Sequence, residues 1–497
     1  MQELFLGVDA GSSVMKAVVF DPSGRVVSIA AERTPLSRPG GGLVEADPDA
    51  AWASLCRVLR KVSAGAEGKG RIAGIGLAGA MVGAWVVDGE GRTLRPGINW
   101  EDARAQPLIE EMTRAHPRLL SDIFAVSGSV LQQGCTLPVT AALLREEPEV
   151  MRRAAAVLGY KDWLRFRLTG RVATDASEAS VAPGDARAQA RSAGLIALFG
   201  LERHAHLLPE VLPSAALAGA VTAEAAAATG LPEGLPVAAG AGDVIAGVIG
   251  AGGLRAGALT GILGTTCMIG LCGDSPVFDP PDLGLLFSLP ERHWFRAMTN
   301  VAGTLNLDWA AGLLFPHFAG RGDILALVEP LAAAQPVGAR GVVYLPYLSE
   351  SGIIAPVADA RARAQFAGLT PVHGREAMIR AVYEGVAFSI ADLCDLLAPP
   401  AEAPLVLTGG GARSPFWCRM IAEVTGREVV VPEGSEFGAR GAALLAATAL
   451  GRFGSVAEAS RAVVGGGTSH RPEGAQAAAW QAANDRYRET RDRAFGA

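Results

Sequence analysis

The first part of the chain alternates short apolar runs with polar turns. The apolar runs cover residues 4–9, 14–20 and 25–31. This pattern predicts three strands joined by tight turns. Asp47 then precedes a segment with apolar residues at helical spacing, and residues 71–78 return to the strand pattern. Strands that alternate with helices over short turns indicate an α/β protein.

The second half of the chain repeats this succession of elements. A strand, a hydroxyl-rich turn and a strand are followed, further on, by a strand, a glycine-rich turn and a helix: 258–263, 264–266, 267–271, 405–408, 409–414 and from 415 onward. The repetition predicts two duplicated α/β domains that flank a central cleft.

Glycines cluster between the two repeats, at 250–257, and mark the expected domain boundary. The predicted domains are therefore residues 1–250 and residues 251–497. The tail 475–497 is polar and charged, and we expect it to form a terminal helix exposed to solvent.

Composition narrows the class of protein. The chain has 497 residues, a formal net charge of −6 and a pI near 5.8, which argue against nucleic acid and against an anionic membrane surface as partners. Half of the residues are hydrophobic, but the best candidate for a membrane span contains Asp243, whose charge is costly to insert into a membrane, so we expect no membrane span. The six cysteines are scattered, and the N-terminus lacks a basic segment, so we expect reduced thiols, no signal peptide and a cytoplasmic location.

Asp243 lies in an apolar, glycine-rich run, Val-Ala-Ala-Gly-Ala-Gly-Asp-Val-Ile-Ala-Gly. A carboxylate is costly to bury there unless it is paired or used. Neighbouring glycines let backbone or ligand approach closely. One interpretation is a general base for a hydroxyl nucleophile. The other is a structural carboxylate that caps a helix, and the run alone does not separate them.

The first turn, between the strands 4–9 and 14–20, combines Asp9, Gly11, Ser12, Ser13 and Lys16. A glycine and two hydroxyls in a tight turn present several N–H and O–H donors to one point, as a phosphate site requires. Asp9 is positioned to hold Mg²⁺, directly or through water, because this ion prefers few carboxylates and retains water. The alternative is an ordinary β-turn in which Asp9 bonds its own backbone.

Two further turns carry related chemistry. The turn at Gly264, Thr265 and Thr266 repeats the glycine-plus-hydroxyl pattern without the carboxylate. Together with the first turn, it could bind the two ends of one triphosphate. The turn at 409–414, Gly-Gly-Gly-Ala-Arg-Ser, leads into a helix, and its small residues admit a flat ring or a phosphate near the helix start. Neither a P-loop nor a dinucleotide-binding fingerprint is present in the sequence.

These segments together resemble the FGGY family of carbohydrate kinases, which have the actin-like, ribonuclease H-like fold. The resemblance extends over nearly the whole chain and in order. The matching segments are Asp9 to Ser13, Trp100-Glu-Asp102-x-Arg104, Tyr160-Lys161-Asp162-Trp-Leu, Thr174-Asp175-x-Ser177, Ala241-Gly-Asp243, Gly264-Thr265-Thr266, Tyr344-Leu-Pro-Tyr-Leu-Ser, Ala381-Val-Tyr-Glu384-Gly-Val-Ala-Phe, Thr408-Gly-Gly-Gly411-Ala-Arg-Ser-x-Phe416-Trp and Glu436-x-Gly438-Ala-x-Gly441-Ala.

The resemblance implies a role for each candidate residue, with ATP and Mg²⁺ as cofactors. Asp243 would be the catalytic base, and Asp9 would hold Mg²⁺, mainly through water. The phosphate-binding residues would be Gly11, Ser12, Ser13, Lys16, Gly264, Thr265 and Thr266, and the adenosine side would be Gly410, Gly411 and Ala412. The substrate-binding residues would be Met81, Val82, Trp100, Asp102 and Asp243.

The chain departs from the xylulokinase-like pattern at two places. That pattern has Met-His where this chain has Met81-Val82, and a polar residue after the base where this chain has Val244. The predicted reaction is phosphorylation of a primary hydroxyl of a small sugar, with a pentulose as the first choice. A polyol kinase of the erythritol, ribitol or glycerol type and an L-xylulose-type kinase are the alternatives within the family.

Rivals of other classes are an actin-fold ATPase without a sugar acceptor and a binding protein that has lost catalysis. Asp243 and the segment from Trp100 to Arg104 argue against both, because neither class needs a base beside a sugar pocket. The oligomeric state, with a homodimer among the options, stays open.

Overall fold

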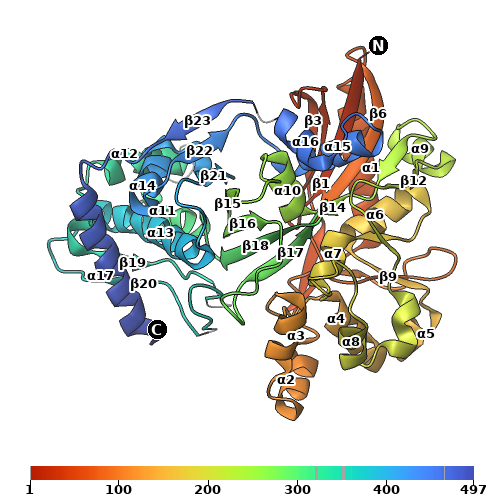
Figure 1. Cartoon of the computed structure of the whole chain (residues 1–497), viewed down its shortest axis with the longest axis horizontal. Helices are drawn as coiled ribbons and strands as arrows, with labels where there is room; N and C mark the ends of the chain where they lie inside the picture. Colours follow the sequence, from red (N-terminus) through yellow and green to blue (C-terminus); the bar gives the residue numbers. More distant parts are fainter. Residues whose placement is uncertain (1, 319–322, 350–352, 360, 464, 497) are drawn as a thin grey trace.

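The computed structural model describes residues 2–318, 323–349, 353–359, 361–463 and 465–496. Within these residues the chain forms two large β-sheets with helices packed around them, one sheet in each half of an elongated molecule (Figure 1). The mixed α/β fold with a repeated architecture, expected from the sequence, is confirmed.

The sheet of the first half contains strands from residues 3 to 242. Its strands in spatial order are β12 (Leu217–Ala220), β13 (Pro236–Ala238), β6 (Arg71–Gly79), β1 (Glu3–Ala10), β2 (Val14–Phe20) and β3 (Val26–Arg33), and β14 (Ala241–Gly242) also pairs with β6. β1, β2 and β3 are antiparallel neighbours, whereas β6 and β13 run parallel to β1.

The sheet of the second half repeats the order of these six strands and adds β17 at one edge. Its order is β17 (Leu285–Leu289), β18 (His293–Asn300), β16 (Cys267–Gly273), β15 (Leu259–Leu263), β21 (Leu405–Thr408), β22 (Val429–Pro432) and β23 (Gly467–His470). β15 pairs antiparallel with β16 and parallel with β21, as β1 does with β2 and β6. Each half therefore opens its sheet with a hairpin, and the two hairpin turns are the two predicted phosphate turns.

The remaining elements surround the sheets. The helices are α1 (Pro48–Ala64), α2 (Gln106–Ala115), α3 (Leu119–Ser127), α4 (Thr136–Glu146), α5 (Pro148–Arg153), α6 (Tyr160–Thr169), α7 (Ala176–Val181), α8 (Ala193–Leu198), α9 (Ala223–Thr229), α10 (Asp243–Gly250), α11 (Leu305–Leu314), α12 (Ile324–Ala333), α13 (Arg375–Leu397), α14 (Pro415–Thr425), α15 (Phe437–Ala449), α16 (Val456–Ala462) and α17 (Ala477–Phe495). The smaller strands are β4 (Leu36–Gly40), β5 (Leu43–Ala46), β7 (Trp85–Val87), β8 (Gly97–Ile98), β9 (Ala156–Leu158), β10 (Thr174–Asp175), β11 (Val211–Leu212), β19 (Val343–Leu345) and β20 (Gln365–Ala367).

Local signals account for the helix starts. α1 begins after Asp47, whose carboxylate accepts a hydrogen bond from Asp49 N at 2.8 Å, with proline at the first helical position. α14 begins after Ser414, whose hydroxyl accepts a hydrogen bond from Trp417 N at 3.0 Å. Both starts lie where the sequence predicts them.

α15 crosses from the second half of the sequence onto the first sheet. Its backbone touches that sheet directly: a Cβ atom at Gly7 would lie 1.8 Å from Ala439 O, and one at Gly76 would lie 2.0 Å from Ala442 O. The opposite face of α15 packs on α10, where a Cβ at Gly441 would lie 1.9 Å from Ala246 O. The first sheet is therefore completed by a helix that the chain supplies only after residue 436.

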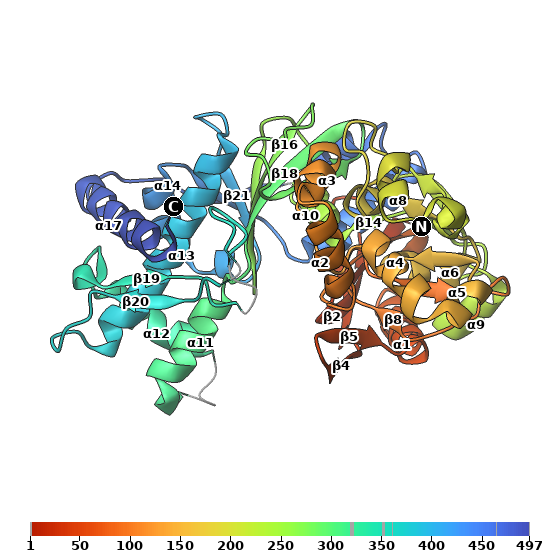
Figure 2. The same ribbon diagram turned by 90° about the horizontal axis from the view of Figure 1, so that it is seen from below.

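The second sheet also reaches the first half. Leu286 N of β17 donates to Ser129 Oγ at 2.8 Å, and Trp294 Nε1 of β18 donates to Ala186 O at 2.6 Å. Seen from below, β16 and β18 lie between the two groups of helices (Figure 2). These bonds tie one edge of the second sheet to the first half.

The terminal helix α17 differs from the expectation. A helix forms at the predicted place, but one face is buried through Trp480, Ala483, Asn484 and Tyr487. Tyr487 Oη lies 2.9 Å from Tyr347 Oη, and Arg488 pairs with Asp392 of α13 at 3.0 Å. The polar composition concealed an apolar stripe wide enough to dock the helix, so the prediction of a solvated helix is wrong.

All six cysteines are free and buried. Among the described residues, no helix combines the length and the apolar character that crossing a membrane requires.

Candidate active site

The turn between β1 and β2 is fixed from behind. Thr34 Oγ1 donates to Gly11 O at 2.6 Å, and Thr34 N donates to Ser13 O at 3.1 Å. These bonds occupy backbone carbonyls of the turn, while Ser13 is exposed and Ser12 is half-buried. Trp100 Nε1 donates to Ser12 Oγ at 2.8 Å. The predicted phosphate turn and the predicted sugar-side tryptophan are therefore in direct contact.

Asp9 ends β1 beneath this turn. Among the described residues, its Oδ1 atom is buried without a hydrogen-bond partner. A Cβ atom at Gly438, in the first turn of α15, would lie 2.3 Å from Asp9 Oδ2, so only glycine permits this approach. Burial, together with the nearby Asp243 carboxylate, raises the pKa of Asp9 to about 7, although the positive charge of Lys16 acts in the opposite direction. An orphaned carboxylate oxygen in this setting fits a site for Mg²⁺ or its water.

Lys16 forms an ion pair with Glu436, with Nζ 2.7 Å from Oε2. Glu436 precedes α15 and adopts a left-handed backbone with φ 57°. The pair joins β2 to the start of α15. The charge of Lys16 is thus shared with a carboxylate in this structure, which the sequence pattern did not indicate.

Asp243 is the first residue of α10 and is half-buried. Its Oδ1 accepts a hydrogen bond from Val244 N at 2.8 Å, while the N-cap residue is Gly242. Burial raises the pKa of Asp243 to about 6. The carboxylate thus lies at a helix start, close enough to Asp9 to raise its pKa, with a proton affinity suited to a general base near neutral pH.

The glycines before Asp243 serve close contacts. Gly240 has φ 83°, and a Cβ there would lie 1.9 Å from Leu77 O of β6. A Cβ at Gly242 would lie 2.2 Å from Met81 Sδ. Met81 therefore packs directly against the segment that carries Asp243.

Val82 follows Met81 and is held by its backbone. Val82 N donates to Glu178 Oε1 at 2.5 Å, and its φ of 59° is unusual for a β-branched residue. The Val82 side chain is only 5% exposed and packs in a cluster with Ala241 and Ile245. Val82 thus presents little side-chain surface to a substrate. Glu178, which the sequence analysis did not select, fixes the Val82 backbone.

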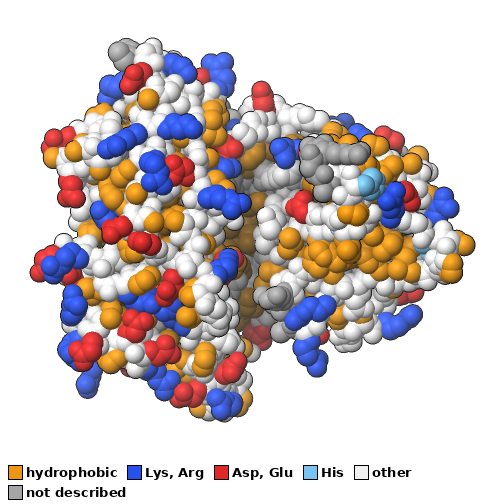
Figure 3. Space-filling model, turned by 180° about the vertical axis from the view of Figure 1, so that it is seen from behind, with side chains coloured by type: hydrophobic (Ala, Val, Ile, Leu, Met, Phe, Trp, Pro, Cys, Tyr) orange, Lys and Arg blue, Asp and Glu red, His pale blue; other side chains and the backbone are white. Residues whose placement is uncertain are grey.

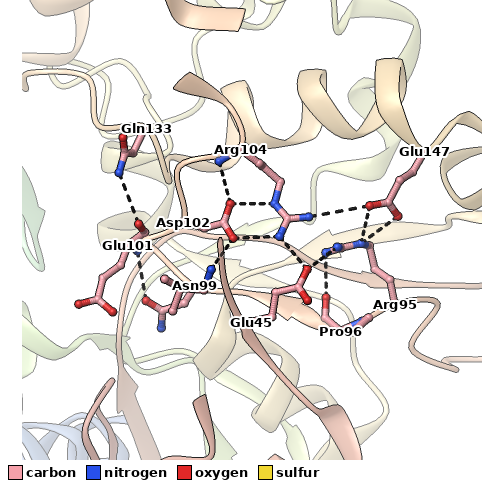
Figure 4. A network of polar contacts seen from close by, with 10 residues as sticks. Glu45, Arg95, Pro96, Asn99, Glu101, Asp102, Arg104, Gln133 and Glu147 are labelled. Atoms are coloured by element: carbon pink, nitrogen blue, oxygen red, sulfur yellow. Dashed lines mark hydrogen bonds and ion pairs between the residues drawn. The ribbon is translucent and has the colours of Figure 1, made fainter. Parts of the chain in front are cut away.

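Asp102 belongs to a network of ion pairs (Figure 4). Its carboxylate is completely buried and accepts hydrogen bonds from Arg104 Nε at 2.8 Å and from Val44 N at 2.8 Å. Arg104 also forms an ion pair with Glu45, which in turn forms an ion pair with Arg95. In this structure Asp102 holds the loop that carries Trp100, the tryptophan predicted to lie beside the sugar. Direct contact between Asp102 and a sugar stays a prediction that requires this carboxylate to change partners.

The turn between β15 and β16 lies beside the glycine-rich turn after β21. Gly303 N donates to Thr265 O and Thr304 N donates to Gly264 O, each at 2.7 Å, while the Thr265 and Thr266 side chains are exposed. These bonds join the turn to the start of α11.

The glycine-rich turn is shaped by close contacts of its own. A Cβ at Gly409 would lie 2.5 Å from Leu263 O, one at Gly411 would meet the Leu263 side chain at 2.5 Å, and Gly410 faces open space. Ala412 is buried below them. The second predicted phosphate turn and the predicted adenosine turn therefore form one surface of the second half, and Figure 3 shows a deep groove between the two halves.

Comparison with known proteins agrees with this arrangement. Residues 4–250 match the model of the FGGY family of carbohydrate kinases, N-terminal domain, and residues 259–450 match that of the C-terminal domain. An erythritol kinase of Brucella abortus is 33% identical over 98% of this chain and 96% of its own length. A xylulose kinase of Escherichia coli is 32% identical over 89% of each chain. The crystal structure of xylulose kinase from Rhodospirillum rubrum is 29% identical, covers 98% of both chains and superposes with a TM-score of 0.86.

Proposed function

The chain belongs to the FGGY family of carbohydrate kinases, and from this premise we propose that it transfers the γ-phosphoryl group of ATP to a primary hydroxyl of a small open-chain sugar or polyol. The enzyme is a phosphotransferase with an alcohol group as acceptor. Asp243 carries the proposal, because its half-buried carboxylate has a pKa of about 6, lies close enough to the predicted metal residue Asp9 to raise its pKa, and follows Gly242, which packs on Met81.

In the proposed reaction Asp243 accepts the proton of the acceptor's hydroxyl group. The hydroxyl oxygen bonds to the γ-phosphorus while the bond from that phosphorus to the β–γ bridging oxygen breaks and ADP leaves. A pKa of about 6 leaves the carboxylate ionised at neutral pH while it stays more basic than an exposed aspartate. Phosphoryl transfer needs little covalent chemistry from the protein, so positioning and charge neutralisation supply most of the catalysis.

The two hairpin turns are the proposed phosphate sites. Ser12 and Ser13 on one side, and Thr265 and Thr266 on the other, offer hydroxyl and backbone donors, with Lys16 as an additional positive charge. Gly410, Gly411 and Ala412 would face the adenosine, where the lack of bulk at Gly410 leaves room for a flat ring. Mg²⁺ held near Asp9 would neutralise charge on the phosphate oxygens.

A pentulose is the proposed acceptor, because a xylulose kinase is among the relatives that match most of the chain. A four-carbon polyol is the second candidate. The erythritol kinase of Brucella abortus supports it, as does Val244, where xylulokinase-like members have a polar residue. An apolar wall discriminates weakly between acceptors, so we expect turnover of more than one.

The test is ADP release with D- and L-xylulose, ribulose, erythritol, ribitol, glycerol and a hexulose, each beside a reaction without acceptor. Pentulose-dependent ADP release above the acceptor-free rate would support the proposal. Faster release with erythritol than with any pentulose would identify the four-carbon polyol as the acceptor instead. Equal release with and without every acceptor would instead favour an actin-fold ATPase.

We also propose a cytoplasmic location, consistent with the need for ATP and with six free cysteines.

A further inference from the structure

A chain of buried polar groups lies behind the predicted base. Gly242, the residue before Asp243, donates its N–H to Ser177 Oγ at 2.9 Å. Ser177 Oγ donates to Asp175 Oδ2 at 2.7 Å, and Lys161 Nζ lies 2.9 Å from Asp175 Oδ1. Lys161, Asp175 and Ser177 are all 0% exposed. The groups come from α6, the start of α7 and the segment before α10, so this row of polar groups joins elements that are distant in sequence.

The charges of this cluster are balanced. Lys161 also pairs with Asp162 at 2.5 Å, and Arg165 pairs with Asp162 at 2.8 Å. Two cations thus face two carboxylates in the interior. Buried ion pairs are a poor source of stability, because desolvation offsets their attraction. A cluster of this kind fixes geometry, since removal of any member leaves a charge unpaired.

The link to Gly242 is the informative part of the cluster. β14 is only two residues long, and its pairing with β6 ends at Gly242, so the ladder alone holds this segment weakly. Because Ser177 accepts the Gly242 N–H, its own proton goes to the Asp175 carboxylate. A hydroxyl polarised by a buried carboxylate is a stronger acceptor. The peptide immediately before the base is thereby tied to a rigid, charged anchor.

We propose that Ser177 is a positioning residue for phosphoryl transfer, which holds the Asp243 carboxylate in place through the Gly242 amide with Asp175 and Lys161 as its anchor. This inference rests on the proposed function. Catalytic groups must be held to within about 0.5 Å, and a displacement of about 1 Å costs roughly 100-fold in rate.

The chain offers a matched control. Ser214 Oγ also donates to Asp175 Oδ2, at 2.9 Å, and Ser214 is 4% exposed, but the structure shows no bond from it to Gly242. Ser177→Ala and Ser214→Ala therefore each remove one buried hydroxyl from the same carboxylate. Only the first removes the support of the base. Ser177→Cys keeps the side-chain volume with a weak acceptor and tests the same bond without a cavity.

The experiment measures kcat, the KM for ATP and the melting temperature of the three variants with the best acceptor of the wild type. We expect Ser177→Ala to lower kcat per folded molecule by about 10–100-fold with the KM for ATP unchanged, and Ser177→Cys to lower it less. Ser214→Ala should keep the wild-type kcat. In an Asp243→Asn background, Ser177→Ala should change the residual rate by less than about twofold, because the two residues act as a unit.

Equal kcat values for Ser177→Ala and Ser214→Ala would overturn the inference, as would a full loss from Ser177→Ala in the Asp243→Asn background. Either result leaves the proposed kinase intact. If Ser177→Ala does not fold, a wild-type kcat in folded Ser177→Cys overturns the inference and a reduced one supports it. A wild type that releases no acceptor-dependent ADP would overturn the proposed function itself, together with the inference.

Discussion

Replacement of Asp243 by asparagine should nearly abolish turnover and at the same time stabilise the protein. Burial raises the pKa of this carboxyl from 3.8 to about 6, so the folded state holds a carboxylate that it tolerates poorly at neutral pH. Each factor of ten in proton affinity is worth about 1.4 kcal/mol, which sets the destabilisation at no more than about 3 kcal/mol. Asparagine has nearly the same shape and carries no charge.

The pH dependence of this effect has a definite sign. The unfolded chain ionises Asp243 near pH 4, and the folded chain does so only near pH 6. The stability that wild type draws from the bound proton is complete below pH 4 and is lost as the pH rises through 6. Asp243→Asn should therefore melt about 1–4 °C above wild type at pH 7.5, and the difference should vanish near pH 4.

Catalysis should move in the opposite direction. Loss of a general base costs about 10²–10⁴-fold, so acceptor-dependent ADP release should fall by that factor while ATP binding persists. Wild-type kcat/KM should decline tenfold per pH unit below about pH 6, because protonated Asp243 cannot accept the hydroxyl proton. In the variant this acid limb should be lost.

Asp47 supplies the control, because it is an exposed aspartate that caps α1. Asp47→Ala should cost about 1 kcal/mol of stability and keep full turnover. Melting curves, ATP titration and ADP release on the same preparations distinguish the two cases. Near-wild-type turnover in folded Asp243→Asn, or a melting temperature lowered as in Asp47→Ala, would refute the assignment of Asp243 as the base.

Three further predictions test other parts of the site. Asp9→Ala should weaken Mg·ATP use far more than acceptor binding, measured as KM for ATP at several Mg²⁺ concentrations against acceptor affinity without nucleotide; equal losses in both would make Asp9 structural. Burial raises the pKa of Glu178 to about 8, so its carboxyl is protonated at pH 7; Glu178→Gln should therefore keep activity, whereas Glu178→Ala should raise the acceptor KM by releasing Val82. The bound proton stabilises the fold fully below about pH 4.5, and this stability is lost as the pH rises through 8, so the melting temperature of Glu178→Gln should exceed that of wild type by a margin that grows over that range. A glutamine variant as impaired as the alanine variant would contradict this prediction. Residues 1–250 expressed alone should be insoluble or lack a cooperative melting transition, because α15 covers their sheet, and co-expression with 251–497 should restore folding; a stable, monodisperse fragment would contradict it.

Much of the fold follows from local signals in the sequence. The two hairpins were predictable because each consists of apolar runs around a turn of glycine and hydroxyl residues, and the start of α14 because Ser414 precedes a proline. The crossing of α15 onto the first sheet was not predictable, because it depends on small residues such as Gly7 and Gly76 that read as ordinary strand positions until a helix backbone touches them.

The candidate site shows the same division. Asp9 and Asp243 attract attention because a carboxylate beside glycines in an apolar run is costly, which is a local property of the sequence. The burial of Asp102 is not local, because Val44 N and Glu45, which satisfy it and its partner Arg104, lie on a strand far earlier in the chain. The sequence predicted Asp102 as a member of the site and could not show that its carboxylate already accepts hydrogen bonds from Val44 and Arg104.

The short helix α7 shows why such long-range contacts matter for the mechanism. On this helix Ser177 holds the amide before the predicted base, Glu178 holds the backbone of Val82, and Ser180 Oγ accepts the Ser288 N–H of β17 at 3.2 Å. The segment before the predicted base, the backbone of the predicted acceptor-side residue Val82 and the edge of the second sheet are thus anchored on one short helix. Phosphoryl transfer to a small, mobile acceptor requires that the base and the acceptor site keep a fixed mutual geometry, and a shared anchor on α7 would supply it.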